Sequence, residues 1–123
     1  MIGIINSVGT AHFSSYENLS SSKIDQINNI NINSLHYLLK LQHNLQKNKF
    51  IKEKSFFVNI SSITARHPHS YSTVYAATKA YISNLIEGVS QERKNTTFLD
   101  VRPWFVKTKM VNNQNTWDTA LPE

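Results

Sequence analysis

Three short apolar runs, separated by longer stretches with helical spacing, constrain the fold more than any other feature of the chain. The runs have the composition of β-strands, and they are Met1–Ile5 (MIGII), Ser55–Ile60 (SFFVNI) and Thr97–Arg102 (TFLDVR). Asn6 ends the first run, and Pro103 closes the third. Strands that alternate with helices are typical of βαβ units, in which parallel strands are joined by helical crossovers. The pattern therefore predicts an α/β fold with a parallel sheet.

Helical patterns fill both intervals between these strands. The hydroxyl residues of Ser20–Ser22 are suited to cap a helix that begins near Lys23. A second helical stretch runs from about Ser34 to Asn48, so two segments make up the first crossover. The second crossover is one helix within Tyr71–Arg93, where apolar residues recur at helical spacing.

Composition excludes several classes of protein. The chain has 123 residues, of which 40% are hydrophobic and 17% charged, as in an ordinary globular domain. Its longest apolar runs are a few residues, far below the roughly 20 that cross a bilayer. The absence of cysteine excludes disulfides and thiol catalysis.

The formal net charge is +5, with an obvious cluster of lysines at positions 47, 49, 52 and 54. These lysines follow a helical apolar pattern, and cations are stabilised at the C-terminus of a helix by its dipole. A solvated helix end is therefore the favoured interpretation. A nucleic-acid surface is the alternative, but no binding motif supports it, and we expect no nucleic-acid partner.

Polar groups follow each strand at the point where it ends. These groups lie in Asn6–Gly9, in Ser61–Ser62 and in Pro103–Thr108. Ligands of parallel α/β sheets bind outside the carboxyl ends of the strands. We therefore expect the three segments to line one crevice.

Tyr75 and Lys79 are separated by four residues, which places them on one face of the long helix. An ammonium near a phenol favours the phenolate and lowers a pKa that starts near about 10, so the tyrosine becomes a proton donor or acceptor. A solvated surface pair is the default interpretation of this spacing alone. Ser62 adds context, because it lies 13 residues before Tyr75 at the end of a strand, and Asn31 lies where the two helical segments join.

Together these residues resemble the motifs of the short-chain dehydrogenase/reductase family, in the family's order. The motifs are N-S-V-G (Asn6–Gly9), I-N-I-N-S (Ile30–Ser34), N-I-S-S (Asn59–Ser62), Y-A-A-T-K (Tyr75–Lys79) and P-W-F-V-K-T-K-M (Pro103–Met110). Ser7 replaces the second asparagine of the family's N-N-A-G, and Trp104 replaces the glycine after the loop proline.

The resemblance implies a role for each matching residue. Tyr75 would protonate a developing alkoxide, and Ser62 would hydrogen-bond and orient the same oxygen. Lys79 would hold the cofactor's ribose hydroxyls and depress the pKa of Tyr75, while Asn31 would fix a water that passes protons to Lys79. The implied cofactor-binding residues are Asn6, Gly9, Tyr75, Lys79, Pro103, Val106 and Thr108.

Within the family, the chain is most similar to the 17-beta-hydroxysteroid dehydrogenases and very-long-chain 3-oxoacyl-CoA reductases. This similarity implies hydride transfer between NADP(H) and a lipid-like ketone or alcohol, with NAD(H) left open. It also implies a location in the cytoplasm or on the cytoplasmic face of the endoplasmic reticulum. Membrane attachment would reside in segments outside this chain.

The resemblance also implies a partial Rossmann-like three-layer fold, whose strands correspond to the family's strands 4, 5 and 6. Residues 1–123 would form a partial domain, without the glycine-rich cofactor half and the C-terminal end. Both sheet edges would then be exposed, which favours homo-oligomers through strand pairing. The alternative is a catalytically inert truncated remnant or an interaction module.

His67 and His69 flank Pro68, and this spacing invites a metal interpretation. No third ligand follows at a suitable distance in the sequence, so we expect exposed loop histidines and no metal site. A weaker alternative places Arg66 at the rim of the substrate site, facing an acidic group such as a CoA phosphate.

Overall fold

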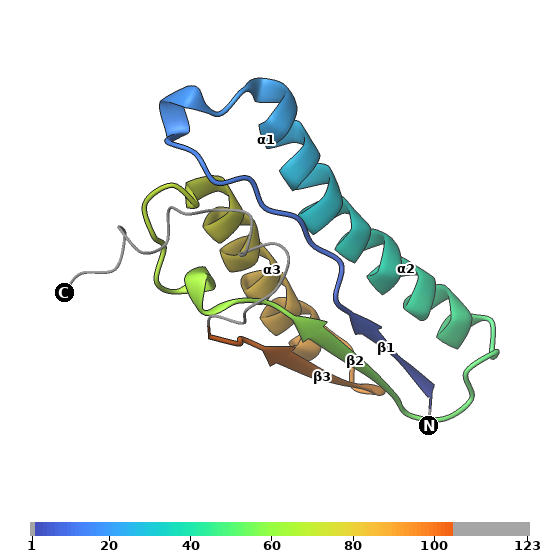
Figure 1. The fold of residues 1–123 in the computed structure, drawn as a ribbon. Coiled ribbons are helices and arrows are strands. Elements are labelled where there is room, and N and C mark those ends of the chain that lie inside the picture. The colour runs from blue at the N-terminus through green and yellow to red at the C-terminus, as the bar shows by residue number, and fades with distance from the viewer. Residues whose placement is uncertain (1, 105–123) are drawn as a thin grey trace.

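The computed structural model describes residues 2–104, and residues 1 and 105–123 lie outside the described part. Its strands and α-helices are β1 (Ile2–Asn6), α1 (Ser21–Asn28), α2 (Ser34–Lys47), β2 (Ser55–Ile60), α3 (Thr73–Glu92) and β3 (Thr96–Val101) (Figure 1). Three short helical segments complete the described elements, and they are η1 (Tyr16–Asn18), η2 (Asn29–Asn33) and η3 (Ile63–Ala65). The strand and helix assignments from the sequence are confirmed, with boundaries that differ by two residues or fewer.

The three strands form a parallel sheet in the order β1-β2-β3. The expected α/β fold with a parallel sheet is thereby confirmed. The register aligns Ile4 with Phe57 and Phe57 with Phe98, so one apolar row crosses the middle of the sheet. Within residues 2–104, β1 and β3 are the two edges, in agreement with the expected order of the strands.

In the first crossover, α1 and α2 form one continuous helix, because the π-helical segment η2 joins them (Figure 1). Ser20 is the N-cap of α1, and its hydroxyl accepts a hydrogen bond from the Lys23 amide at 3.4 Å. This contact satisfies one of the amides that the first turn of a helix leaves without a partner. The junction expected at Asn31 is therefore a wide π-helical turn between α1 and α2.

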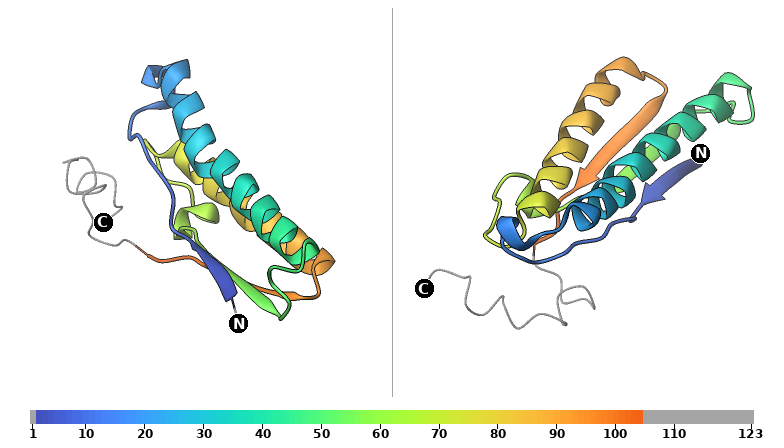
Figure 2. Two further views of the ribbon diagram at one scale, coloured as in Figure 1. Left: turned by 90° about the vertical axis from the view of Figure 1, so that its right-hand side faces the viewer. Right: turned by 90° about the horizontal axis from the view of Figure 1, so that it is seen from above.

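Both long helices cover the same face of the sheet (Figure 2). Leu35 and Leu39 of α2 meet Phe57 of β2, and Ile82 and Ile86 of α3 complete this buried core. On the opposite face, the described part of the chain leaves apolar side chains exposed, among them Ile5 at 65% and Leu99 at 55%. Residues 2–104 thus form the sheet and one helical layer of the expected three-layer arrangement.

Two polar rows flank the apolar row on the helix-facing side of the sheet. At the amino ends of the strands, Ser55 aligns with Thr96, and we call this pair the amino-end row. At the carboxyl ends, Asn6, Asn59 and Asp100 align across all three strands and form the carboxyl-end row. Since the polar groups that follow the strands lie beyond the carboxyl-end row, this row forms the floor of the candidate site.

No helix among residues 2–104 combines the length and the apolar character needed to span a bilayer.

Candidate active site

Tyr75 and Lys79 are at the centre of the candidate site, one turn apart on the same face of α3. The Lys79 ammonium lies over the phenol ring, with Nζ 5.5 Å from the ring centroid. Lys79 is only 4% exposed, and Tyr75 is half-buried beside the ring of Phe13, 6.5 Å away between centroids. This burial excludes the solvated surface pair that the spacing alone favours.

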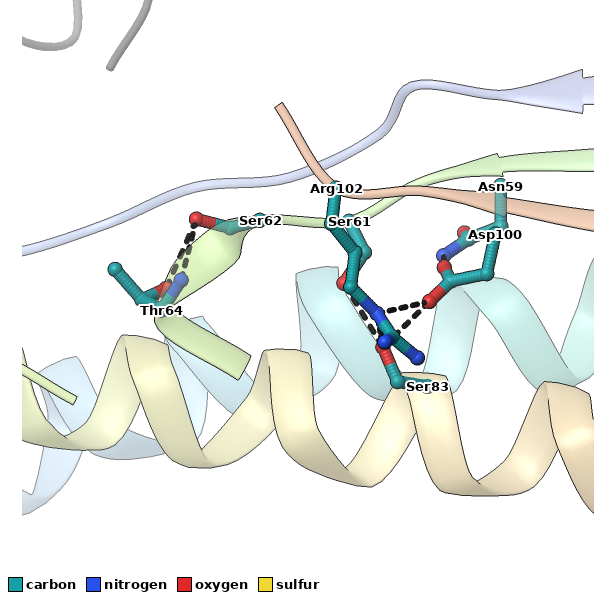
Figure 3. A network of polar contacts seen from close by, with 7 residues as sticks. All are labelled: Asn59, Ser61, Ser62, Thr64, Ser83, Asp100 and Arg102. Carbon is teal, nitrogen blue, oxygen red and sulfur yellow. Dashed lines mark hydrogen bonds and ion pairs between the residues drawn. The ribbon is translucent and has the colours of Figure 1, made fainter. Parts of the chain in front are cut away.

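Ser62 follows β2 and caps the short helix η3 (Figure 3). Its hydroxyl oxygen accepts two hydrogen bonds from Thr64, one from the amide at 3.2 Å and one from Oγ1 at 2.9 Å. With both acceptor positions occupied, the O–H of Ser62 is left to donate outward. Side-chain hydrogen bonding to Ser62 lowers the pKa of the Tyr75 phenol, so the two side chains lie next to each other beyond the carboxyl end of β2.

The direction of the Tyr75 pKa corrects one expectation. Lys79 was expected to depress this pKa, but burial of the phenol raises the pKa of Tyr75, and the hydrogen bond from Ser62 only partly opposes the rise. Tyr75 is therefore held in its protonated form in the free protein, as a proton donor requires.

Lys79 is perturbed in the opposite direction. Its burial disfavours the charged ammonium and lowers the pKa of Lys79, while the nearby charge of Asp100 raises it again. Among the charged or titratable side chains, Asp100 is thus a partner of Lys79 that the motif comparison does not include. It belongs to the carboxyl-end row.

Asn31 is completely buried in η2. Its Oδ1 accepts from the Thr10 amide at 2.7 Å, and its Nδ2 donates to the Thr10 carbonyl at 2.9 Å and to Thr78 Oγ1 at 3.0 Å. The amide therefore ties the loop after β1 to the helix that carries Tyr75 and Lys79. Its expected role in fixing a water stays a prediction.

Asn6 at the end of β1 lies beside Asn59, and Gly9 in the loop after β1 lies beside Lys79. Asn6 Oδ1 accepts from the Val8 amide at 3.2 Å, and its Nδ2 donates to Asn59 Oδ1 at 2.9 Å. A Cβ added to Gly9 would lie 3.2 Å from Lys79 Nζ and 3.7 Å from Asn31 Oδ1. Glycine thus keeps the space beside the ammonium open, and a buried cation with open space beside it suits the hydroxyls of a ribose.

Pro103 lies beside the segment that contains Ser62. Its carbonyl accepts from the Ile63 amide at 3.1 Å, and the Val101 carbonyl accepts from the Ser61 amide at 2.7 Å. The structure therefore brings together every expected site residue that it describes. Val106 and Thr108 lie outside the described residues.

Several residues that the sequence comparison did not single out complete the site. Thr64 orients Ser62, and Thr78 holds Asn31. A network around Asp100 lies beside Ser62 and Thr64 (Figure 3). Asp100 shares strand parity with Phe98, which packs on the core. A carboxylate on the buried side of a strand is the one signal in the sequence that points to this network.

Among the described residues, no three His, Asp or Glu side chains come together as metal ligands. The expectation of exposed loop histidines is confirmed for His67, whereas His69 is half-buried in the loop before α3.

The parallel sheet, the helical crossovers and the Ser62, Tyr75 and Lys79 grouping define an α/β protein of the Rossmann-like class. A sequence model described as short chain dehydrogenase matches residues 2–119. The chain therefore belongs to the short-chain dehydrogenase/reductase family.

Relatives and solved structures agree with this assignment. A very-long-chain 3-oxoacyl-CoA reductase from Anas platyrhynchos is 30% identical over 103 residues, which cover 81% of this chain and 32% of that protein. A 3-ketoacyl-(acyl-carrier-protein) reductase from Brucella melitensis, complexed with NADH, superposes with a TM-score of 0.82 at 18% identity, covering 91% of this chain and 48% of the other. A 3-oxoacyl (acyl-carrier-protein) reductase from Agrobacterium tumefaciens, with NADP bound, gives 0.80 at 24% identity, covering 97% and 46%. At these identities, the two structures show the fold alone.

The chain spans between 24% and 40% of the length of the curated relatives it matches.

Proposed function

We propose that this chain carries the proton-transfer half of an NAD(P)-dependent oxidoreductase that interconverts a ketone and an alcohol. One observation carries the proposal. Ser62 accepts two hydrogen bonds from Thr64 and lies next to the half-buried Tyr75, which shares one face of α3 with the buried Lys79. Two hydroxyl donors thus converge on one point, where the oxygen of a carbonyl substrate would lie.

The roles of the residues follow from this geometry. Ser62 donates its hydrogen bond to the carbonyl oxygen and holds it beside Tyr75. Tyr75 Oη gives its proton to that oxygen as negative charge develops there. The positive charge of Lys79 and the hydroxyl of Ser62 then stabilise the phenolate that remains. When bound, the nicotinamide cofactor supplies the hydride.

The cofactor would lie along the carboxyl ends of the strands. Lys79 and Tyr75 are proposed to hold the ribose hydroxyls beside Gly9, with Asn6 shaping the loop. Pro103 begins the segment whose Val106 and Thr108 are proposed to contact the nicotinamide. NADP(H) is the proposed cofactor, and NAD(H) remains the alternative.

The proposed substrate is a lipid-like carbonyl compound, most readily a 3-oxoacyl-CoA, with a keto-steroid as the second candidate. The name of the relative from Anas platyrhynchos supports the acyl-CoA. A place in the cytoplasm or on the cytoplasmic face of the endoplasmic reticulum is also proposed, and it rests on the family resemblance of the motifs alone. The greater length of the relative from Anas platyrhynchos also supports the proposal that residues 1–123 form part of a larger domain.

The test is isotope transfer by the natural protein that contains these residues. Reduced cofactor deuterated at the transferable position is incubated with a long-chain 3-oxoacyl-CoA, and the product alcohol is analysed by mass spectrometry. We expect one deuterium on the carbinol carbon. A folded protein that transfers none to any ketone offered would contradict the proposal and favour the inert interaction module.

A further inference from the structure

Asp100 accepts several hydrogen bonds at the carboxyl ends of the strands. Its Oδ1 accepts from Asn59 Nδ2 at 2.9 Å, and its Oδ2 accepts from Ser83 Oγ at 2.6 Å and from Arg102 Nε at 2.9 Å (Figure 3). The Asp100 side chain is only 10% exposed. Three donors around one buried carboxylate fix its position.

The partners of Asp100 lead to three separate parts of the site. Asn59 bonds to Asn6, whose side chain shapes the loop after β1. Ser83 lies one helical turn beyond Lys79, on the face of α3 that also carries Tyr75. Arg102 lies directly before the segment that begins at Pro103.

Ser83 also contacts the residue that precedes Ser62 at the end of β2. Ser83 Oγ lies 3.2 Å from Ser61 Oγ, and Ser61 immediately precedes Ser62. The carboxylate therefore joins the element that carries Lys79 to the element that carries Ser62.

Asp100 also matters through its charge. Of the charged or titratable groups near Lys79 in the described structure, Tyr75 lies on the same helix and Asp100 lies on β3, where Arg102 is paired with Asp100. The loop after β1 and η2 contribute Gly9 and the neutral amide of Asn31. Asp100 is thus the acidic partner that offsets the cost of burying an ammonium at this position.

We propose that Asp100 is a positioning residue of this site, whose carboxylate fixes the Lys79 face of α3 and supplies the negative charge that balances the Lys79 ammonium. The inference rests on the proposed function, because it assigns Lys79 a working role. Arg102 moderates the charge of Asp100 through their ion pair.

The test follows the proton on Lys79 without requiring turnover. The complete chain is labelled with a trace of acetic anhydride at a series of pH values, and mass spectrometry quantifies acetylation of Lys79 relative to the exposed Lys40. The rate of acetylation reports the fraction of neutral amine. Asp100→Asn keeps the size of the side chain and removes its charge, so the midpoint for Lys79 should fall by about half a pH unit or more.

Two further variants separate charge from structure. Ser83→Ala removes a partner of Asp100 without changing any charge, so the Lys79 midpoint should stay within about 0.2 pH units of the unmodified chain, well below the shift expected from losing a charge. Arg102→Met removes the cation that moderates Asp100, and the midpoint should rise. This opposite sign keeps the test decisive even if Asp100→Asn fails to fold.

An unchanged midpoint in a folded Asp100→Asn would overturn the proposal, as would equal falls in Asp100→Asn and Ser83→Ala. A fall in Arg102→Met would overturn it as well. Failure of the natural protein to reduce ketones would sink the proposed function while leaving the Lys79 titration interpretable, so the two failures are distinguishable.

Discussion

The two polar rows lie on the same side of the sheet and differ in charge. In the amino-end row, Ser55 Oγ and Thr96 Oγ1 lie 3.1 Å apart, and Gln46 Nε2 donates to Ser55 Oγ at 2.8 Å. Every group in that row is neutral. In the carboxyl-end row, a chain of bonds through Asn6, Asn59 and Asp100 ends on a carboxylate that interacts with Lys79.

The two rows therefore differ in role: the amino-end row supports the packing of α2, and the carboxyl-end row lies at the candidate site. Neutral amides and hydroxyls bond across the amino-end row and lock α2 onto the strands. Gln42 Nε2, for example, donates to the Phe56 carbonyl at 2.9 Å. Charge appears where the strands end and the polar loops converge. Burial of charge is costly, so its presence in one row only indicates that this row serves the site.

The largest effect is expected at Tyr75. Tyr75→Phe removes the proton donor and preserves the volume of the ring, so ketone reduction by the natural protein should fall by about 100-fold or more. The measurement is the steady-state rate of cofactor oxidation at saturating ketone. Tyr37→Phe, on the exposed face of α2, is the matched control and should keep the full rate. Near-normal turnover in Tyr75→Phe would mean that another group supplies the proton.

The next largest effect is expected from a substitution at Asn59, in the middle of the carboxyl-end row. Asn59→Leu leaves Asn6 Nδ2 and Asp100 Oδ1 buried without these partners, which should cost roughly 1–3 kcal/mol of unfolding free energy. The cost is measured by urea denaturation. An unchanged midpoint of unfolding would show that the row is not a connected network.

Lys79 gives a pH-dependent effect of smaller size. Burial lowers its pKa in the folded protein, so the unfolded chain binds this proton more tightly, and folding stability rises with pH from the folded-state pKa toward the unfolded value of 10.5. Lys79→Met removes the buried charge, so it should be more stable than the unmodified chain at neutral pH. This advantage should shrink as the pH approaches the unfolded value. Unfolding experiments across that range would contradict the account if the advantage grew instead.

The smallest effect is expected at Gln42, whose side chain contacts Ser55 of the amino-end row. Gln42 is buried, and among the described atoms its Oε1 has no hydrogen-bond partner. Gln42→Met preserves the shape of the side chain and removes this unsatisfied acceptor, which offsets the lost bond to Phe56. The unfolding free energy should change by less than about 1 kcal/mol, and the rate of ketone reduction should not change. A large loss of rate in this variant would break the distinction between the two rows.

Much of this fold could be predicted from the sequence because its signals are local. The run Ser55–Ile60 matches β2 residue for residue, and Ser20 caps α1 as its hydroxyl suggests. The convergence of Ser62 with Tyr75 also followed, since parallel strands end at one edge of the sheet.

The features that the sequence did not predict depend on burial and on contacts that form only when the elements pack together. The pKa of Tyr75 is raised because burial of the phenol outweighs the hydrogen bonding to Ser62. The links from Asp100 to Ser83 and from Thr64 to Ser62 join residues that no motif relates. Such bonds depend on helix position and strand register together, and a sequence pattern fixes neither to within the length of a hydrogen bond.

The proposed function requires that Lys79, near the carboxyl-end row, binds the nicotinamide side of the cofactor. The most direct test is binding of nicotinamide mononucleotide to the chain, followed by saturation-transfer NMR on the ligand signals, which also works if the exposed edges drive oligomerisation. We expect binding with a dissociation constant in the millimolar range, or roughly 4 kcal/mol. This binding should be lost in Lys79→Met and retained in Gln42→Met. Equal binding by the two variants, or loss only in Gln42→Met, would contradict the account.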